Sequence, residues 1–160
     1  MYQNKRPIHP SKVVIVKDEI EKLCTTGFIY PIAYIKWVSN PIPKNKKQGT
    51  NCICIDFLDL NWVCPKDNLP TPFIHQIINV CTKHDVFSFM DIFFGYNQIQ
   101  IWEEDHYKTT FTTPWGTFAY RVMPFGLKNV GATFQHDVIH CFCDLIHIML
   151  VYLDNLIAWS

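Results

Sequence analysis

Apolar residues recur along the chain at spacings typical of helices and of strands. Val13, Val16 and Ile20 lie three or four residues apart, which predicts a helix. Ser11 can cap its start, and Gly27 can end it. Further helices are predicted over Phe73–Cys81 and Ala132–Cys143.

Runs of apolar and β-branched residues, bounded by Pro, Gly and Asx residues, predict strands. A basic hairpin is predicted where Lys44–Gly49, a polar turn with three lysines, precedes a strand over Thr50–Phe57. At the end of the chain, Asp154 and Asn155 join two short apolar runs as a tight hairpin. The other extended segments are predicted over Phe28–Pro31, Val86–Asp91, Thr109–Thr113 and Thr117–Val122, and the arms of the last hairpin over Met149–Leu153 and Leu156–Trp159.

The β-α-β-β-α-β order of the back half predicts a ferredoxin-like split βαβ fold. Its class is α+β, with an antiparallel sheet and helices on one face. In that arrangement the end of Val86–Asp91 lies beside the tip of the final hairpin. Asp91 and Asp154 are 63 residues apart in the sequence, yet their carboxylates are expected to converge.

Composition favours one globular domain over residues 1–160. Apolar residues make up 49% of the chain, enough for a core. The first ten residues have no apolar signal region, and no run approaches the ~20 apolar residues of a membrane span. Seven cysteines, an odd number without a secretory signal, predict reduced thiols. We therefore expect an intracellular protein that is not secreted and has no membrane partner.

Charge is unevenly distributed, although the net charge is zero. Residues 1–50 carry nine Lys/Arg and three Asp/Glu, a net charge of +6, whereas residues 51–160 carry −6. A basic front half suits contact with phosphate, and an acidic back half suits metal binding.

Several motifs, taken together and in order, resemble reverse transcriptases of Ty3/gypsy-type LTR retrotransposons. Ser88–Asp91 followed by Gly95–Ile99 resembles the first catalytic motif, Met123–Gln135 the motif around the incoming nucleotide, and Tyr152–Asn155 the Tyr-x-Asp-Asp hairpin. The other segments that fit are Trp37–Pro41, Ile55–Asn61, Cys64–Asp67 and Phe111–Gly116. Each piece is weak alone, but the combined resemblance covers nearly the whole chain.

The resemblance implies a right-hand polymerase whose fingers and palm are interleaved along the chain. It implies an RNA or DNA template–primer and a deoxynucleoside triphosphate as partners. It also implies that the thumb, connection and RNase H parts are not included here. A polypeptide that supplies thumb and RNase H is therefore an expected partner, because palm surfaces that those parts cover would otherwise be exposed.

The implied reaction is attack of a primer 3′-hydroxyl on the α-phosphate, assisted by two Mg²⁺ (or Mn²⁺) ions. By resemblance Asp91 and Asp154 are the bridging ligands, and the backbone carbonyl of Ile92 assists. Asn155 stands where the family has a second Asp. At ~4 Å and an effective dielectric of about 20, one charge–charge interaction is worth roughly 4 kcal/mol. Half of that in the barrier would slow the step by more than about tenfold.

The resemblance also implies a nucleotide site. Tyr96 matches the aromatic residue that excludes a ribose 2′-OH, and Phe125 and Gly126 would flank the nucleotide. Lys46 or Lys47, at the tip of the basic hairpin, would reach the triphosphate. Each of these residues also has a plain structural interpretation, as a core aromatic or a solvated turn.

Three further positions depart from the family pattern. Cys52 replaces an Arg that would bind triphosphate, and a thiol cannot form that bidentate contact. Phe94 stands where Ser is common, and Val130 where Ala is usual.

The departures leave several functions open. The chain is an impaired or inactive polymerase, a still-active minimal polymerase, or a non-catalytic nucleic-acid-binding or interaction module. A zinc module is a further alternative, suggested by a cluster without a paired Cys-x-x-Cys: His136, His140, Cys141, Cys143 and His147.

The departures share one form that the coding DNA can test. Asp to Asn, Arg to Cys, Ser to Phe and Ala to Val each require one C-to-T or G-to-A transition. We therefore predict that the codons of Cys52, Phe94, Val130 and Asn155 differ from the family codons by such transitions, as deamination of a silenced element would produce. Sequencing the locus and its relatives checks this, and transversions at these codons would contradict it.

Overall fold

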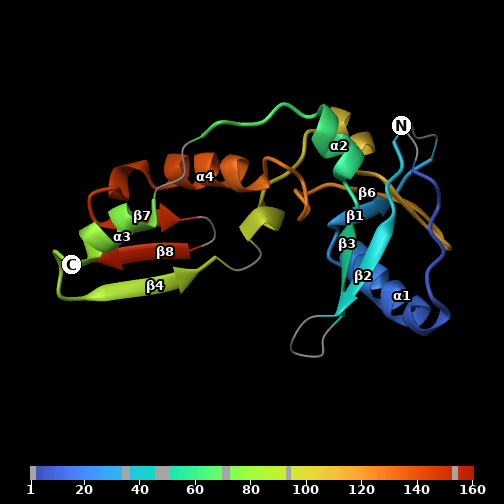
Figure 1. Cartoon of the computed structure of the whole chain (residues 1–160), viewed down its shortest axis with the longest axis horizontal. Coiled ribbons are helices and arrows are strands. Elements are labelled where there is room, and N and C mark those ends of the chain that lie inside the picture. The colour runs from blue at the N-terminus through green and yellow to red at the C-terminus, as the bar shows by residue number, and fades with distance from the viewer. Residues whose placement is uncertain (1–2, 34–36, 46–50, 70–72, 93–94, 153–154) are drawn as a thin grey trace. The chain divides into compact units, whose positions relative to one another are not determined.

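A computed structural model describes residues 3–33, 37–45, 51–69, 73–92, 95–152 and 155–160 of the chain (Figure 1). These residues form two compact units, each built from two separate stretches of sequence. The first unit contains Met1–Pro65 and Ile99–Leu127, and the second contains Lys66–Gln98 and Lys128–Ser160. Among the described residues, no helix has the length and apolar character needed to cross a membrane.

Helix α1 (Pro10–Thr25) opens the first unit at a cap that differs from the prediction. His9, not Ser11, is the N-cap, and its Nδ1 accepts the backbone N–H of Ser11 at 3.3 Å. The physical reason is Pro10, which suits the first helical position because that position needs no N–H donor. Gly27 ends the helix region as predicted, with a φ of +75° that favours glycine.

Within its described residues, the first unit contains two separate antiparallel sheets. One has the strand order β1-β6-β5, and the other is the predicted hairpin of β2 and β3, whose turn at residues 46–50 lies outside the described part. A short α-helix, α2, and a 3₁₀ helix, η2, complete this unit. The helix α2 was not predicted from the sequence. The bounds are β1 (Ile29–Pro31), β2 (Pro41–Asn45), β3 (Asn51–Ile55), α2 (Leu58–Val63), η2 (Glu103–Thr109), β5 (Phe111–Thr113) and β6 (Gly116–Tyr120).

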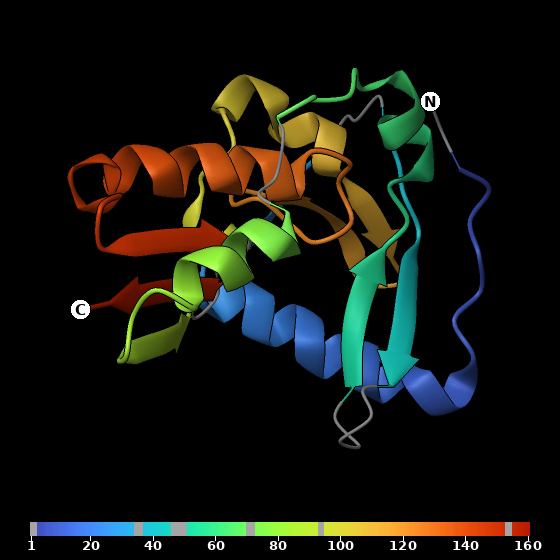
Figure 2. The same ribbon diagram turned by 60° about the vertical axis from the view of Figure 1, so that its left-hand side comes forward.

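The core of the first unit lies where α1 packs against β3 and β1 (Figure 2). Phe111 has no exposed surface, and Val16 and Phe57 are almost fully buried beside it. Burial raises the pKa of the Tyr120 hydroxyl above its usual value. The remaining members of this core are Ile20, Ile29 and Ile55.

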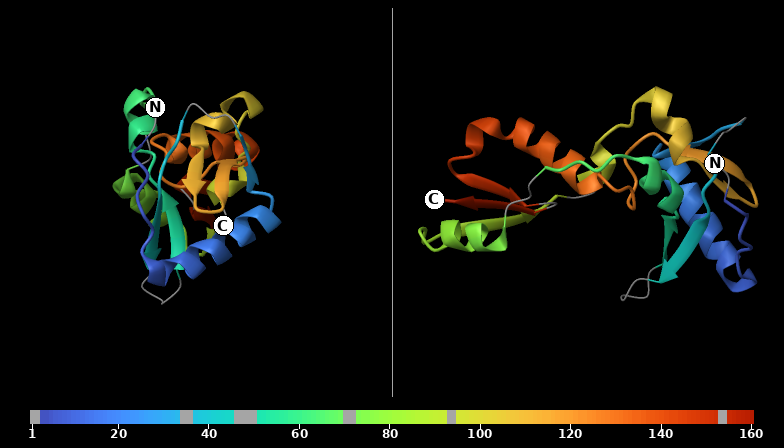
Figure 3. Two further views of the ribbon diagram at one scale, coloured as in Figure 1. Left: turned by 90° about the vertical axis from the view of Figure 1, so that its right-hand side faces the viewer. Right: turned by 45° about the horizontal axis from the view of Figure 1, so that its top comes forward.

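The second unit is a three-stranded antiparallel sheet with helices, in the strand order β4-β8-β7 (Figure 3). Helix α4 runs along β7, and its buried side chains are Val130, Phe134, Gln135 and Val138. The bounds are α3 (Ile74–Cys81), β4 (Phe87–Asp91), η1 (Gly95–Gln98), α4 (Val130–Cys141), η3 (Cys143–Leu145), β7 (Met149–Tyr152) and β8 (Asn155–Trp159).

The arrangement confirms the predicted α+β class and the position of the final hairpin. Strand β8 pairs with both β4 and β7, so the end of β4 at Asp91 lies beside the hairpin. The strands β5 and β6 are not in this sheet, because β6 pairs with β1, and β5 with β6, in the first unit. All seven cysteines, which lie in the described part of the chain, are free thiols.

Strand β4 forms an edge of its sheet and carries exposed apolar side chains. Phe89 is 72% exposed and Met90 is also exposed. Within the described ranges, β8 is the one strand that pairs with β4. An apolar edge strand of this kind is a site at which other chains can add a strand.

The contrast between two phenylalanines gives a test of this core. Phe111→Ala should lower the free energy of unfolding by about 3–5 kcal/mol, because it removes a fully buried ring. The control Phe89→Ala removes an exposed ring and should change stability by no more than about 0.5 kcal/mol. Urea denaturation followed by circular dichroism measures both, and equal losses would contradict this account of the core.

Candidate functional site

Asp91 and Asn155 face each other at the end of the ladder between β4 and β8. The antiparallel register runs from Phe87↔Trp159 to Asp91↔Asn155. Directly opposed residues in such a pair project to the same face, with Cβ atoms about 4.5–5.5 Å apart. Tyr152 continues the row on β7, because it pairs with Asn155 from the other side. A carboxylate, an amide and a phenol therefore lie in one line across three strands.

Two features determine what this row can bind. Asp91 and Asn155 are both exposed, so a ligand in solvent can reach them. The carbonyl of Ile92, a predicted ligand, accepts the N–H of Gly95 at 3.1 Å. A carbonyl oxygen has a second lone pair, so this bond leaves it able to contact a cation. Asp154, the other predicted carboxylate, lies outside the described residues.

Tyr96 is held against helix α4 by an aromatic contact. Its ring meets that of Phe134 edge-on, with centroids 5.1 Å apart and an interplanar angle of 80°. Gly95 makes this approach possible, because a Cβ atom at that position would lie 3.1 Å from Cζ of Phe134. The half-buried Tyr96 ring is therefore fixed in orientation.

Gln135 anchors the strand that leads to the hairpin. The residue is 1% exposed, and its Nε2 donates to the carbonyl oxygen of Val151 on β7 at 3.0 Å. Gln135 closes the Met123–Gln135 motif, for which the resemblance implies no role at this position. The signal in the sequence was a Gln among the apolar residues of a predicted helix. If such a side chain is buried, it is nearly always hydrogen-bonded.

The first unit carries the predicted residues Phe125 and Gly126 in a small pocket. Phe125 is 60% exposed, and Gly126 has a φ of +100°, a conformation that favours glycine. Asn61 fixes this turn, because its Nδ2 donates to the carbonyl of Gly126 at 2.7 Å. The pocket has a volume of about 250 Å³, and its lining includes Ile42, Lys44, Phe57, Asn61, Phe125 and Gly126.

The basic hairpin supplies one described cation to this pocket. Lys44 on β2 lines the pocket and pairs in register with Cys52 on β3. Cys52 is half-buried, and it stands at the position where the resemblance implies an Arg. The predicted triphosphate ligands Lys46 and Lys47, like Phe94, lie outside the described residues. The site candidates thus belong to two units: Asp91, Ile92, Tyr96 and Asn155 to the second, Phe125 and Gly126 to the first.

The zinc alternative receives no support from the described residues. Across the ranges that the structure describes, no three His, Cys, Asp or Glu side chains gather as a metal site. His136 instead lies 3.5 Å from a carboxylate oxygen of Asp67.

Comparison with protein families gives one match over most of the chain. The family model described as "Reverse transcriptase (RNA-dependent DNA polymerase)" matches residues 38–160. The matched range includes the Asp91–Asn155 row and the pocket at Phe125 and Gly126.

Curated relatives come from transposons and from a plant. The "RNA-directed DNA polymerase homolog" of Oenothera berteroana is 36% identical over 111 residues, which cover 68% of this chain and 77% of that protein. The "Retrovirus-related Pol polyprotein from transposon 297" of Drosophila melanogaster is 30% identical across 100% of this chain. The chain spans only 16% of that polyprotein, and 12% of the "Transposon Tf2-7 polyprotein" of Schizosaccharomyces pombe, to which it is 28% identical.

Solved structures establish the fold. The prototype foamy virus protease-reverse transcriptase superposes with a TM-score of 0.84 at 21% identity, over 99% of this chain and 21% of that one. The foamy viral enzyme in complex with an RNA/DNA hybrid gives a TM-score of 0.83 at 18% identity, over 99% of this chain and 21% of that one. These likenesses confirm the predicted α+β, fingers-and-palm type of fold.

The contact between Gly95 and Phe134 can be tested by overpacking. Gly95→Ala should lower the free energy of unfolding by about 1–3 kcal/mol, because the added methyl meets a buried ring at 3.1 Å. Phe134→Leu in the same chain should recover part of that loss by vacating the space. Thermal unfolding of the single and double variants measures this, and a strictly additive double variant would contradict the proposed contact.

Proposed function

We propose that this chain, which belongs to the reverse transcriptase (RNA-dependent DNA polymerase) family, is the fingers and palm of a retrotransposon-derived polymerase. In this proposal the second unit is the palm and the first unit the fingers. Its reaction is transfer of a deoxynucleotide to a primer 3′-hydroxyl, directed by a template. The observation that supports it best is the register that sets Asp91 opposite Asn155 at the end of the palm ladder.

The donor atoms at this row fit a hard divalent cation in kind. Mg²⁺ and Mn²⁺ prefer carboxylate, carbonyl and amide oxygens. Asp91 and Asp154, with the carbonyl of Ile92, would hold two such ions. When bound, they supply charge that activates the primer hydroxyl and neutralises the leaving pyrophosphate. Asn155 contributes an oxygen without a charge, so the set has one carboxylate fewer than the family pattern.

The loss of that charge supports a weak or inactive enzyme. Asn and Asp have nearly the same size, so the ladder and the hairpin tolerate either residue. Binding of a nearby dication is weakened by Asn, because the interaction with a carboxylate charge, worth roughly 4 kcal/mol at ~4 Å, is replaced by the weaker interaction with an amide dipole. Cys52 adds a second loss, since a thiol cannot replace the planar guanidinium at triphosphate.

The remaining residues select and orient the nucleotide in this proposal. Tyr96, fixed by Phe134, excludes a ribose 2′-hydroxyl and so favours deoxynucleotides. Phe125 and Gly126 flank the nucleotide, with the backbone of Gly126 held by Asn61. Lys44, together with Lys46 or Lys47, provides the positive charge that phosphate groups attract.

Template–primer duplex is the proposed macromolecular partner. Relatives of known structure were solved in complex with double-stranded DNA and with an RNA/DNA hybrid. The net charge of +6 on residues 1–50 supports contact with a polyphosphate backbone. A second candidate function, a non-catalytic nucleic-acid binder, is favoured specifically by Asn155 and Cys52, because both remove catalytic charge and leave the fold intact.

Restoring the missing charge tests the polymerase proposal. Asn155→Asp should raise primer extension on an RNA template with Mg²⁺ or Mn²⁺ by more than about tenfold. Asp91→Asn in the Asn155→Asp chain is the matched control, because it removes an equal charge on the facing strand and should abolish the gain. Duplex binding without extension in every variant would favour the binding module. Robust extension by the unchanged chain, abolished by Asp154→Ala, would contradict the impairment.

A further inference from the structure

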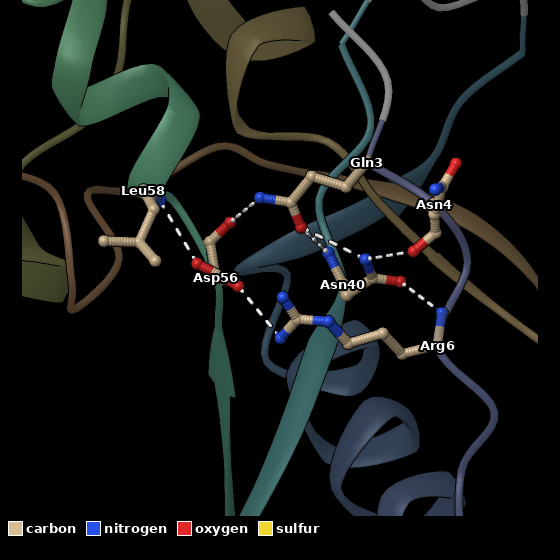
Figure 4. A network of polar contacts seen from close by, with 6 residues as sticks. All are labelled: Gln3, Asn4, Arg6, Asn40, Asp56 and Leu58. Atoms are coloured by element: carbon tan, nitrogen blue, oxygen red, sulfur yellow. Dashed lines mark hydrogen bonds and ion pairs between the residues drawn. The ribbon is translucent and has the colours of Figure 1, made fainter.

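The N-terminal segment 3–6 precedes the range that the family model matches, yet it is bonded into that range. The match begins at residue 38. Side chains and backbone of Gln3, Asn4 and Arg6 nevertheless form a polar network with Asn40 and Asp56 (Figure 4). All of these residues belong to the first unit. We call this set of five residues the brace.

Asn40 is the end of the brace nearest to β2. The residue is buried, and its amide group is satisfied by the N-terminal segment. Gln3 Oε1 accepts from both the backbone N–H and Nδ2 of Asn40, each at 3.1 Å. The Nδ2 also donates to the carbonyl of Asn4 at 2.9 Å, and the backbone N–H of Arg6 donates to Oδ1 at 3.0 Å. A buried amide with these partners fixes the segment in one position.

Asp56 is the other end of the brace and is its one buried charge. Its side chain is 5% exposed, and Oδ2 lies 3.1 Å from Nη1 of Arg6, whose own side chain is 61% exposed. The other carboxylate oxygen accepts the backbone N–H of Leu58 at 3.3 Å, and Gln3 Nε2 donates to the backbone carbonyl of Asp56 at 3.1 Å. A buried carboxylate is costly unless it is paired, and the Arg6 guanidinium and the Leu58 N–H together offset that cost.

The brace continues into the pocket that holds Phe125 and Gly126. Asp56 itself lines that pocket. The N–H that it accepts, from Leu58, belongs to the first residue of α2. Three residues further along this short helix, Asn61 donates to the carbonyl of Gly126 at 2.7 Å. A continuous series of bonded groups thus connects Arg6 to the turn at Gly126.

We propose that Arg6 is a positioning residue of the proposed nucleotide pocket. Its contacts are with Asp56 and Asn40, and no contact with nucleotide or metal is assigned to it. It acts through Asp56, which sets the start of α2 and thereby the place of Asn61 and of the Gly126 carbonyl. This inference rests on the proposed function for its ligand, but the positioning itself is a property of the first unit alone.

The variant that tests it is Arg6→Gln, which removes the charge from an exposed side chain and should leave the chain folded. Lys5→Gln is the matched control, because Lys5 is exposed, carries the same charge and is the neighbouring residue. Arg6→Lys keeps the charge and should therefore behave largely like the unchanged chain in both readouts. Two readouts are compared: hydrogen–deuterium exchange of residues 56–63 and 123–127, and the Kd for a labelled RNA/DNA template–primer with and without a deoxynucleoside triphosphate.

We expect Arg6→Gln to raise exchange in both segments about tenfold, because local opening reports the stability of α2 and the turn. We expect the nucleotide-dependent gain in duplex affinity to fall by about three- to tenfold, since one charge-assisted contact is lost. Lys5→Gln should change neither readout. Equal exchange in the Arg6→Gln and Lys5→Gln chains would overturn the positioning role, even if the duplex binds. An unchanged chain that binds no template–primer would instead contradict the proposed function, and with it the claim about the ligand.

Discussion

Backbone pairing between β4 and β8 is the constraint on which the candidate site depends. Side chains alternate between the faces of a sheet, so a shift of one residue would move every side chain to the opposite face. The register that sets Asp91 opposite Asn155 therefore fixes both which residues meet and on which side. Helix α4 helps to hold this arrangement, because Phe134 packs on Tyr96 and Gln135 donates to the carbonyl of Val151 on β7.

Fold and chemistry are separable in this chain because they rest on different forces. The core residues Phe111, Val16 and Ile157 are apolar, and their burial does not depend on the charge of exposed residues. Asn155 is exposed, so a change from carboxylate to amide there costs the fold little. The same change removes the charge–charge attraction between a carboxylate at this position and a divalent cation. In the proposed polymerase, the arrangement of the site would thus remain although the charge of the family carboxylate is absent.

The sequence predicted those elements whose residue spacing or turn residues are distinctive. The α1 helix, the β2–β3 hairpin and the meeting of Asp91 with the final hairpin followed from spacing, turn residues and connection order. The sequence did not reveal α2, which has only six residues and no long apolar period. It also did not reveal the brace, because a buried carboxylate looks like a surface residue until its distant partner Arg6 is known. The cap at His9 was missed because Pro10, which suits the first helical position, sets the helix start two residues before the one that a Ser11 cap implies.

The exposed edge strand β4 has a consequence for how copies of the chain interact with one another. Its edge presents Phe89 and Met90 to solvent, and a strand from another copy of the chain can add to it. Contacts within one molecule do not depend on how many molecules are present, whereas encounters between edges increase with each new copy. Where this edge is uncovered, association between copies would therefore rise with protein concentration, whereas the stability of the single fold would not.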